Sequence, residues 1–242
     1  MNTGLHMLEL RPDPQRLISF AEGQGINRAD DEDLGYLAHA WLNALFGELA
    51  PKPFRLLAGQ RRHPCLLGYS KGSADQLRDH ARTFALPSAL AVANLDGAPF
   101  TRRMPATWSP GRRLGFEVLV CPVTRQDQKE KDVFLRRLEA TSDAEPPPSR
   151  EKAYIQWLAD QLLPAARLEH GCLAGFQLIR VLRRSQQKAP GAHRNAPRLT
   201  RPQALLRGVL QVEDGATFNR CLARGVGRHR AFGYGMLLLR PA

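Results

Sequence analysis

Two segments of this sequence carry residue types that could act on a phosphate ester. Tyr36 and His39 lie three residues apart in LGYLAHAWLNALFGEL, and on a helix this spacing puts the phenol and the imidazole on one face. The unperturbed pKa of histidine lies near neutral pH, so His39 could accept or donate a proton. A histidine on a leucine-rich helix is also commonly structural, and the spacing alone does not decide between these roles.

The second segment, GVGRHRAFGYG, combines glycines with positive side chains. Gly225 and Gly227 allow a backbone to approach a ligand closely, and successive N–H groups in such a loop can bind an anion. Arg228, His229 and Arg230 add positive charge at the same place. An ordinary glycine turn with solvated arginines would look similar, but the three residue types together favour contact with phosphate.

Other catalytic signatures are missing from the sequence. It contains no H-E-x-x-H motif and no P-loop, and its scattered acidic residues do not predict a two-metal site. The four cysteines, Cys65, Cys121, Cys172 and Cys221, form no C-x-x-C pair and are expected to be free, buried thiols. We therefore predict neither a metal nor a cofactor.

Composition and charge indicate the kind of partner. The 242 residues are 43% hydrophobic, which suffices for a core, and carry a formal net charge of +12. The excess is mainly arginine, whose guanidinium groups grip phosphate oxygens in pairs, so nucleic acid is the expected partner and a merely solubilising surface is the alternative. No apolar run approaches the ~20 residues of a membrane span, and no signal-peptide pattern is visible, so we expect a cytoplasmic protein without membrane contact.

Hydrophobic periodicity predicts the elements that position these residues. In the first half it predicts helices over 34–49 and 73–84 and strands over 5–12, 64–70, 89–95 and 115–123. In the second half it predicts a helix from residue 150, strands over 172–184 and 204–214, a helix over 216–225 and a final strand over 234–241. The first order is close to a ferredoxin-like split βαβ arrangement, and the second would echo it with one more strand from a neighbour.

We predict an α+β protein of two tandem ferredoxin-like (RRM-like) domains. Residues 1–125 form the N-terminal domain with the Tyr-x-x-His helix, and residues 150–242 form the C-terminal domain with a basic hairpin and the glycine-rich loop. Residues 126–149 are a helix-prone insert and a linker, because a charged stretch is followed by SDAEPPPS.

Both motifs resemble one family. GVGRHRAFGYGMLLLRP is similar to the C-terminal glycine-rich loop of the CRISPR repeat-processing endoribonucleases, the Cas-six family of RAMP proteins. The nearest likeness is to the CasE branch of type I-E systems or to the type IV processing subunit. CasE-type enzymes also carry Tyr-x-x-His on their first helix, at the place of Tyr36 and His39. The resemblance covers most of the chain in outline and implies two ferredoxin-like domains.

The resemblance implies metal-independent cleavage of CRISPR repeat RNA (pre-crRNA) at the 3′ base of its stem-loop. The 2′-hydroxyl would attack the adjacent phosphate and leave a 2′,3′-cyclic phosphate. His39 would transfer a proton, Tyr36 would orient the 2′-hydroxyl or hydrogen-bond the phosphate, and Arg28 and Arg228 would stabilise the developing charge. Two alternatives lack catalysis: a subunit that only caps the crRNA hairpin, and a general basic RRM-like protein.

The implied RNA-binding surface has two parts, a basic hairpin that grips the base of the stem-loop and the glycine-rich loop. The expected RNA-binding residues are Arg183, Arg184, Lys188, His193, Arg194, Arg198 and Arg201 of the hairpin, and Arg224, Gly225, Gly227, Arg228, His229 and Arg230 of the loop. The product hairpin would stay bound, and the protein would remain with other subunits of a CRISPR effector complex. The insert could be a further helical finger that touches RNA or a neighbouring subunit.

Overall fold

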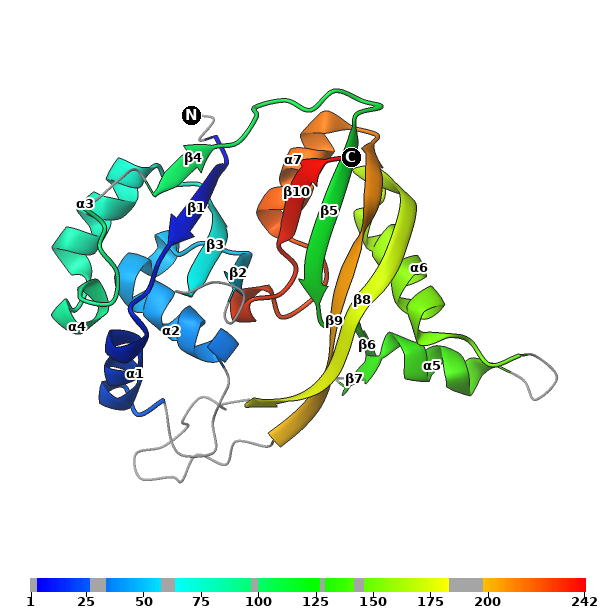
Figure 1. Ribbon diagram of the computed structural model, residues 1–242, viewed down its shortest axis with the longest axis horizontal. Coiled ribbons are helices and arrows are strands. Elements are labelled where there is room, and N and C mark those ends of the chain that lie inside the picture. Colours follow the sequence, from blue (N-terminus) through cyan, green and yellow to red (C-terminus); the bar gives the residue numbers. More distant parts are fainter. Residues whose placement is uncertain are drawn as a thin grey trace.

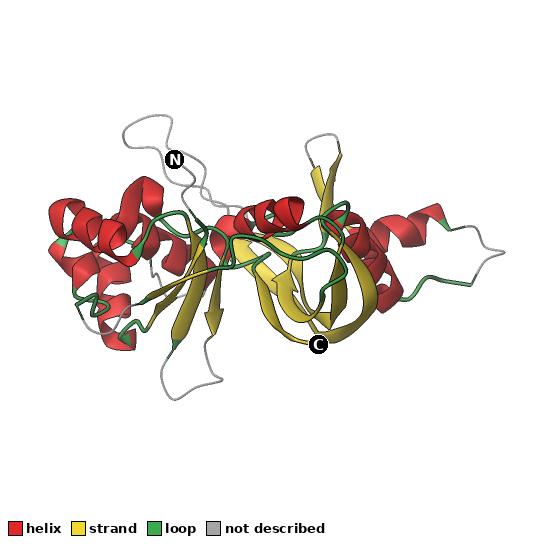
Figure 2. Ribbon diagram, turned by 90° about the horizontal axis from the view of Figure 1, so that it is seen from above, coloured by secondary structure: helices red, strands yellow, loops and turns green. Residues whose placement is uncertain are grey.

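Two antiparallel four-stranded sheets lie side by side, and helices stand at both ends of the molecule (Figures 1 and 2). The structure is a computed structural model that describes residues 4–26, 34–57, 64–96, 100–126, 129–141, 146–182 and 198–242. The chain therefore has a mixed α+β fold. Within these residues, no helix is both long enough and apolar enough to cross a membrane.

The first sheet has the strand order β2-β3-β1-β4. Its strands are β1 (His6–Leu10), β2 (Phe54–Leu57), β3 (Cys65–Ser70) and β4 (Thr101–Arg103). One face is covered by α1 (Pro14–Gly23), α2 (Leu34–Phe46), α3 (Ala74–Phe84) and α4 (Pro87–Leu90), and η1 (Gly47–Leu49) follows α2. α3 begins with a cap, since Ser73 and Gln76 form a reciprocal capping box.

The second sheet has the order β10-β5-β9-β8. Its strands are β5 (Arg113–Val120), β8 (Ala166–Leu182), β9 (Arg198–Val212) and β10 (Leu237–Pro241), with helices α6 (Arg150–Leu162) and α7 (Gly215–Arg224). Between β5 and α6 the chain forms a separate hairpin, β6 (Val123–Gln126) and β7 (Lys129–Asp132), and then α5 (Val133–Ala140). The single turn η2 (Arg230–Phe232) lies in the glycine-rich loop before β10.

One hydrophobic cluster is shared by the two halves, and a second lies between the first sheet and its helices. Alternate residues of the first sheet face opposite ways: Leu66 packs with the helices α1–α4, whereas Leu67 and Tyr69 pack with side chains of α7 and the second sheet. The Tyr69 hydroxyl donates a hydrogen bond to the Leu237 carbonyl oxygen at 2.8 Å. The packing of Leu67 and Tyr69, together with this hydrogen bond, fixes the first sheet and α2 relative to the loop that precedes β10.

One predicted strand is wrong. Residues 89–95, ALAVANL, form the end of α4 and a turn, although their composition suits a strand. Pro87 begins α4 at a position where its missing N–H costs nothing, and Ala89 and Val92 are buried against the helices. The fourth strand of this sheet is instead Thr101–Arg103, for which no strand was predicted.

The strand pairing bears on the predicted boundary at residue 125. β5, placed at sequence level in the N-terminal domain, pairs with β9 and β10 and is a central strand of the second sheet. β5 is therefore the additional strand that the second half was predicted to require for a ferredoxin-like arrangement. The helix-prone insert is helical only from Val133 to Ala140 among the described residues, because the charged stretch before it forms the β6–β7 hairpin.

Candidate functional site

The helix α2 holds Tyr36 and His39 at the edge of its buried face. Leu37, Ala38 and Trp41 are buried against the first sheet and its helices, and Tyr36 and His39 are half-buried beside them. This is the arrangement that three- and four-residue apolar spacing dictates. We call Tyr36 and His39 the α2 face.

The glycine-rich loop lies directly against the α2 face, and the ring of Phe232 makes the contact. This ring stacks on Tyr36, with 6.2 Å between ring centroids, and meets His39 edge-on at 5.4 Å. His229 of the same loop lies 6.3 Å from it. Figure 1 shows this red segment between α2 and the second sheet, so residues about 190 positions apart in the sequence form one site.

Burial changes the acid–base character of His39. Desolvation disfavours the imidazolium form, and the positive charge of Lys52 acts in the same direction, so the pKa of His39 lies below its ordinary value. The neutral form of the imidazole is therefore favoured at pH 7 in the free protein. A neutral imidazole can accept a proton.

The glycines of the loop are explained by contacts inside the protein. Gly225, Gly227, Gly233 and Gly235 all have positive φ, between 72° and 86°, where side chains other than hydrogen are strained. A Cβ on Gly227 would lie 2.8 Å from the Trp157 ring, and one on Gly235 would collide with the carbonyl oxygen of Val226. The loop therefore needs glycine to fold back on itself and on α6, whether or not RNA is bound.

Glu130 of β7 contacts two arginines and a histidine. It accepts hydrogen bonds from Arg228 at 2.8 Å and lies 3.0 Å from the His229 Nε2 and 3.1 Å from Arg201. Its side chain is 13% exposed. We call Glu130, Arg201, Arg228 and His229 the loop cluster; it joins β7, β9 and the glycine-rich loop.

The carboxyl group of Glu130 is held ionised. Burial alone would raise its pKa, but the hydrogen bonds from Arg228 and His229 and the charge of Arg201 outweigh it, so its pKa lies below the ordinary value. Two guanidinium groups share this one carboxylate, so the loop cluster keeps an excess of positive charge. Such a surface attracts an anion.

The remaining predicted residues are distributed as follows. Arg224 ends α7, and its carbonyl oxygen accepts a hydrogen bond from Arg230 at 2.8 Å, which closes the loop. Gly225 terminates α7 as expected, with its N–H bonded to Cys221. Arg198 begins β9. Arg28, Arg183, Arg184, Lys188, His193 and Arg194 lie outside the described residues.

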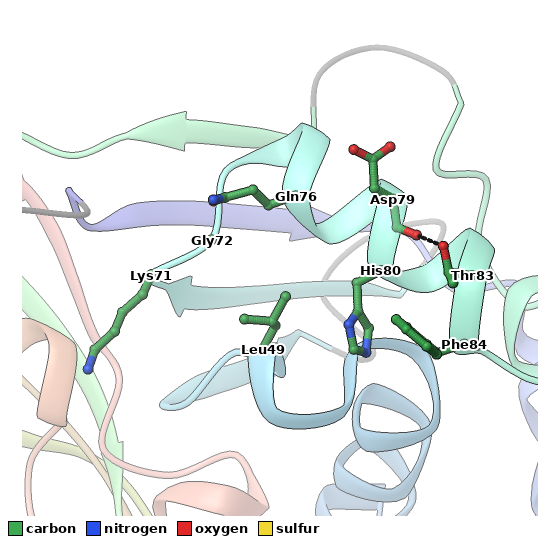
Figure 3. A pocket seen from close by; sticks show the side chains of 8 residues that line it. All are labelled: Leu49, Lys71, Gly72, Gln76, Asp79, His80, Thr83 and Phe84. Atoms are coloured by element: carbon green, nitrogen blue, oxygen red, sulfur yellow. Dashed lines mark hydrogen bonds between the residues drawn. The ribbon is translucent and has the colours of Figure 1, made fainter. Parts of the chain in front are cut away.

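A separate hollow lies between η1 and α3 (Figure 3). Its volume is about 590 Å³, and His80, Phe84, Lys71 and Leu49 are among its lining residues. None of the predicted site residues lines it. The hollow therefore gives no support to the chemistry of the α2 face.

The described residues contain no group of three or more His, Cys, Asp or Glu side chains placed to hold a metal ion. Cys65, Cys121, Cys172 and Cys221 are free thiols; Cys172 is partly exposed and the other three are buried. Burial raises the pKa of Cys121 to about 12, so this thiol is unreactive at neutral pH. The prediction of free thiols is confirmed, and the expected burial is wrong for Cys172.

Sequence reasoning missed three members of the site. Phe232 lies within the quoted loop, but nothing local indicates that its ring would reach α2. Glu130 is one of several charges in the stretch QDQKEKD, and its partners lie far along the chain. Lys52 acts on His39 across the fold. Only three-dimensional proximity could reveal them.

The chain matches one known protein family over nearly its whole length. A family model described as CRISPR associated protein matches residues 5–241. Comparison with curated protein sequences gave no match.

Solved structures share the fold over the whole chain. The structure of the CRISPR endoribonuclease Cse3 bound to 19-nucleotide RNA is 19% identical and superposes with a TM-score of 0.62, covering 98% of this chain and 100% of that one. Thermus thermophilus Cse3, bound to an RNA representing a pre-cleavage complex, is 17% identical with a TM-score of 0.60 and the same coverage. A chain of a CRISPR RNA-guided surveillance complex is 14% identical, with a TM-score of 0.57 over 98% of this chain and 100% of that one.

Proposed function

This chain belongs to the CRISPR-associated protein family, and we propose that it is a metal-independent endoribonuclease that cuts CRISPR repeat RNA. The cut falls at the 3′ base of the repeat stem-loop and yields a mature crRNA with a 2′,3′-cyclic phosphate. The observation that carries this proposal is the meeting of the α2 face with the glycine-rich loop at Phe232. A proton acceptor and a cationic anion-binding surface thus lie on adjoining elements.

The proposed reaction is an internal transesterification. The 2′-hydroxyl oxygen bonds to the adjacent phosphorus while its proton passes to the neutral imidazole of His39. The bond from phosphorus to the 5′ oxygen breaks and the leaving oxygen takes a proton from the solvent. The imidazolium of His39 later returns its proton to the solvent, so no water is consumed. Tyr36 orients the 2′-hydroxyl or donates a hydrogen bond to the phosphate.

Arg228 supplies the charge that the pentacoordinate phosphorus needs. Its side chain is 42% exposed and reaches Glu130, so it is available at the surface of the loop cluster. Positioned cations that meet charge developing in the transition state commonly make the largest contribution to catalysis. Arg28, which precedes α2 in the sequence, stays a candidate for the same role.

We also propose that the two halves are ferredoxin-like domains divided between Arg103 and Arg113. In each sheet the first and third strands of the unit are central and the second and fourth are at the edges. Counted in chain order, both sheets have the order 4-1-3-2, which is typical of the βαββαβ arrangement. This division replaces the boundary at residue 125.

RNA binding is assigned to the loop cluster and to the basic residues near the ends of β8 and β9. By likeness to the Cse3 chain bound to RNA, these surfaces would hold the stem-loop before and after cleavage. By likeness to the chain of the surveillance complex, the protein would stay with other CRISPR subunits.

A cleavage assay tests the proposal. The wild-type protein is incubated with its repeat RNA in EDTA, beside an unrelated RNA hairpin of equal length. We expect one cut at the 3′ base of the repeat stem and no cut in the unrelated hairpin. Tight repeat binding without a cut would identify a hairpin-capping subunit, and equal binding of both RNAs would identify a general basic RNA-binding protein.

A further inference from the structure

Glu130 occupies a position that the proposed reaction does not explain. It is a carboxylate inside a surface that is expected to bind phosphates, where a negative charge weakens binding. The side chains of Arg201, Arg228 and His229, which contact it, are all expected to bind RNA. A carboxylate in this place needs another reason.

The hairpin that carries Glu130 is firmly held. Two residues further on, Asp132 is buried and accepts hydrogen bonds from Arg150 at 2.8 Å and from the Tyr154 hydroxyl at 2.9 Å. The guanidinium group of Arg150 lies between two aromatic rings, 4.1 Å from the Phe134 centroid and 4.2 Å from the Phe176 centroid. These contacts fix β7 to α5, α6 and β8, so Glu130 projects from a rigid support.

The residue that Glu130 holds is conformationally unusual. His229 has φ 58°, and it is the only residue other than glycine with positive φ among the described residues. A histidine in the left-handed region is strained and needs support from its surroundings. The 3.0 Å contact between its Nε2 and Glu130 provides that support.

The same turn places Phe232. The Phe232 N–H donates a hydrogen bond to the His229 carbonyl oxygen at 2.8 Å, which forms η2. The Phe232 ring then contacts His39 and Tyr36. A continuous set of contacts therefore runs from Glu130 through His229 and Phe232 to the α2 face.

We propose that Glu130 is a positioning residue, which holds the Arg228–His229 turn so that Phe232 is seated against His39 and Tyr36. Its negative charge weakens RNA binding, but its contacts keep the site ordered. The inference rests on the proposed function for its catalytic readout, but its structural part concerns the free protein. The proposal assigns to Glu130 no contact with RNA.

The substitution Glu130→Gln separates positioning from binding. It keeps the shape of the side chain and removes its charge. We expect the cleavage rate with saturating protein to fall about tenfold to a hundredfold, because small displacements of reacting groups have effects of this size. Repeat RNA affinity should stay equal or increase, since a negative charge has left the surface. The matched control is Glu139→Gln, which removes an equal charge from a carboxylate on α5 that pairs with Lys131; its rate should stay within twofold of wild type.

Phe232→Leu provides a second variant, because it keeps an apolar side chain and removes the ring. We expect the same signature, a slower cut with unchanged affinity, and no further loss in the double variant with Glu130→Gln. Multiplicative losses in the double variant would overturn the proposal, as would a Glu130→Gln rate equal to that of Glu139→Gln.

A spectroscopic measurement keeps this inference distinct from the proposed function. The His39 ring resonances in the free protein report its contact with Phe232, and Glu130→Gln should shift them while Glu139→Gln does not. Unchanged resonances in a folded Glu130→Gln protein would overturn the inference even where the wild type cuts RNA. A wild type that does not cut, with shifted resonances in this variant, would refute the proposed reaction and leave the coupling intact.

Discussion

His39 and His229 contact the same phenylalanine from two different electrostatic environments. On the α2 face, desolvation and Lys52 lower the pKa of His39 and favour its neutral form. In the loop cluster, His229 faces the carboxylate of Glu130 beside two arginines. Two neighbouring imidazoles can therefore have different roles because their surroundings differ. His39 is suited to accept a proton, and His229 is suited to stabilise a turn.

The largest expected effect is on the α2 face. His39→Ala should slow cleavage of the repeat RNA by about 10² to 10⁴, the usual range for the loss of a general base, and leave RNA affinity within about twofold. Single-turnover cleavage and equilibrium binding measure the two quantities. The control is His80→Ala, since His80 lies in the separate hollow on α3. Cleavage by His39→Ala at the wild-type rate would show that His39 is not the base and would favour a mechanism that depends on arginines.

The next effect concerns the glycine-rich loop. Gly235 and Gly111 have nearly equal φ, 78° and 80°, but a Cβ on Gly235 would meet the Val226 carbonyl oxygen and one on Gly111 would meet nothing within 4 Å. We expect Gly235→Ala to lower the free energy of unfolding by about 1–3 kcal/mol more than Gly111→Ala does, because it adds overpacking to the same backbone strain. Urea unfolding measures both variants. Equal losses would mean that the loop relaxes freely and that its glycines serve another purpose.

These two regions also show what the sequence could predict. The spacing of Leu37, Trp41 and Leu42 indicated the helix α2. It therefore also indicated that Tyr36 and His39 lie on the same side of that helix. Ser73 as the cap of α3 and Gly225 as the end of α7 were also predictable, because each depends on local hydrogen bonding. Local rules thus gave most helices and the longer strands.

Features that depend on distant partners could not be predicted. ALAVANL has the composition of a strand, but it packs as a short helix and a turn against neighbouring helices. β5 follows the first half in sequence but pairs with β9, which lies about 90 residues later. Glu130 stands in the charged stretch that was predicted to be helix-prone, and only the tertiary fold brings it to Arg201, Arg228 and His229.

The pH dependence of cleavage tests the assignment of His39. With His39 as base, kcat/KM rises with pH while the imidazole loses its proton in the free protein, and then levels off. Because the pKa of His39 is below the ordinary 6.5, we expect the midpoint of this rise below pH 6.5. Initial cleavage rates at low RNA concentration, from pH 4.5 to 8, give the profile. A midpoint well above pH 6.5 would indicate that another group accepts the proton.

The smallest expected effect distinguishes two arginines of the loop cluster. The side chain of Arg228 is 42% exposed and that of Arg201 is 15% exposed, although both pair with Glu130. Arg228→Gln should reduce the slope of log affinity against log salt by about 0.7 to 0.9, the contribution of one phosphate contact, and Arg201→Gln should reduce it less. Binding titrations at several salt concentrations measure the slopes. A wild-type slope near zero would contradict the electrostatic account of the whole surface.

The chemical identity of the new RNA ends tests the central claim most directly. Mass spectrometry of the cleaved repeat RNA should find a 2′,3′-cyclic phosphate on the upstream fragment and a 5′-hydroxyl on the downstream one. A single 2′-deoxy substitution at the scissile nucleotide should abolish the cut. Products with a 3′-hydroxyl and a 5′-phosphate, or cleavage of the deoxy-substituted RNA, would contradict attack by the 2′-hydroxyl and with it the proposed role of His39.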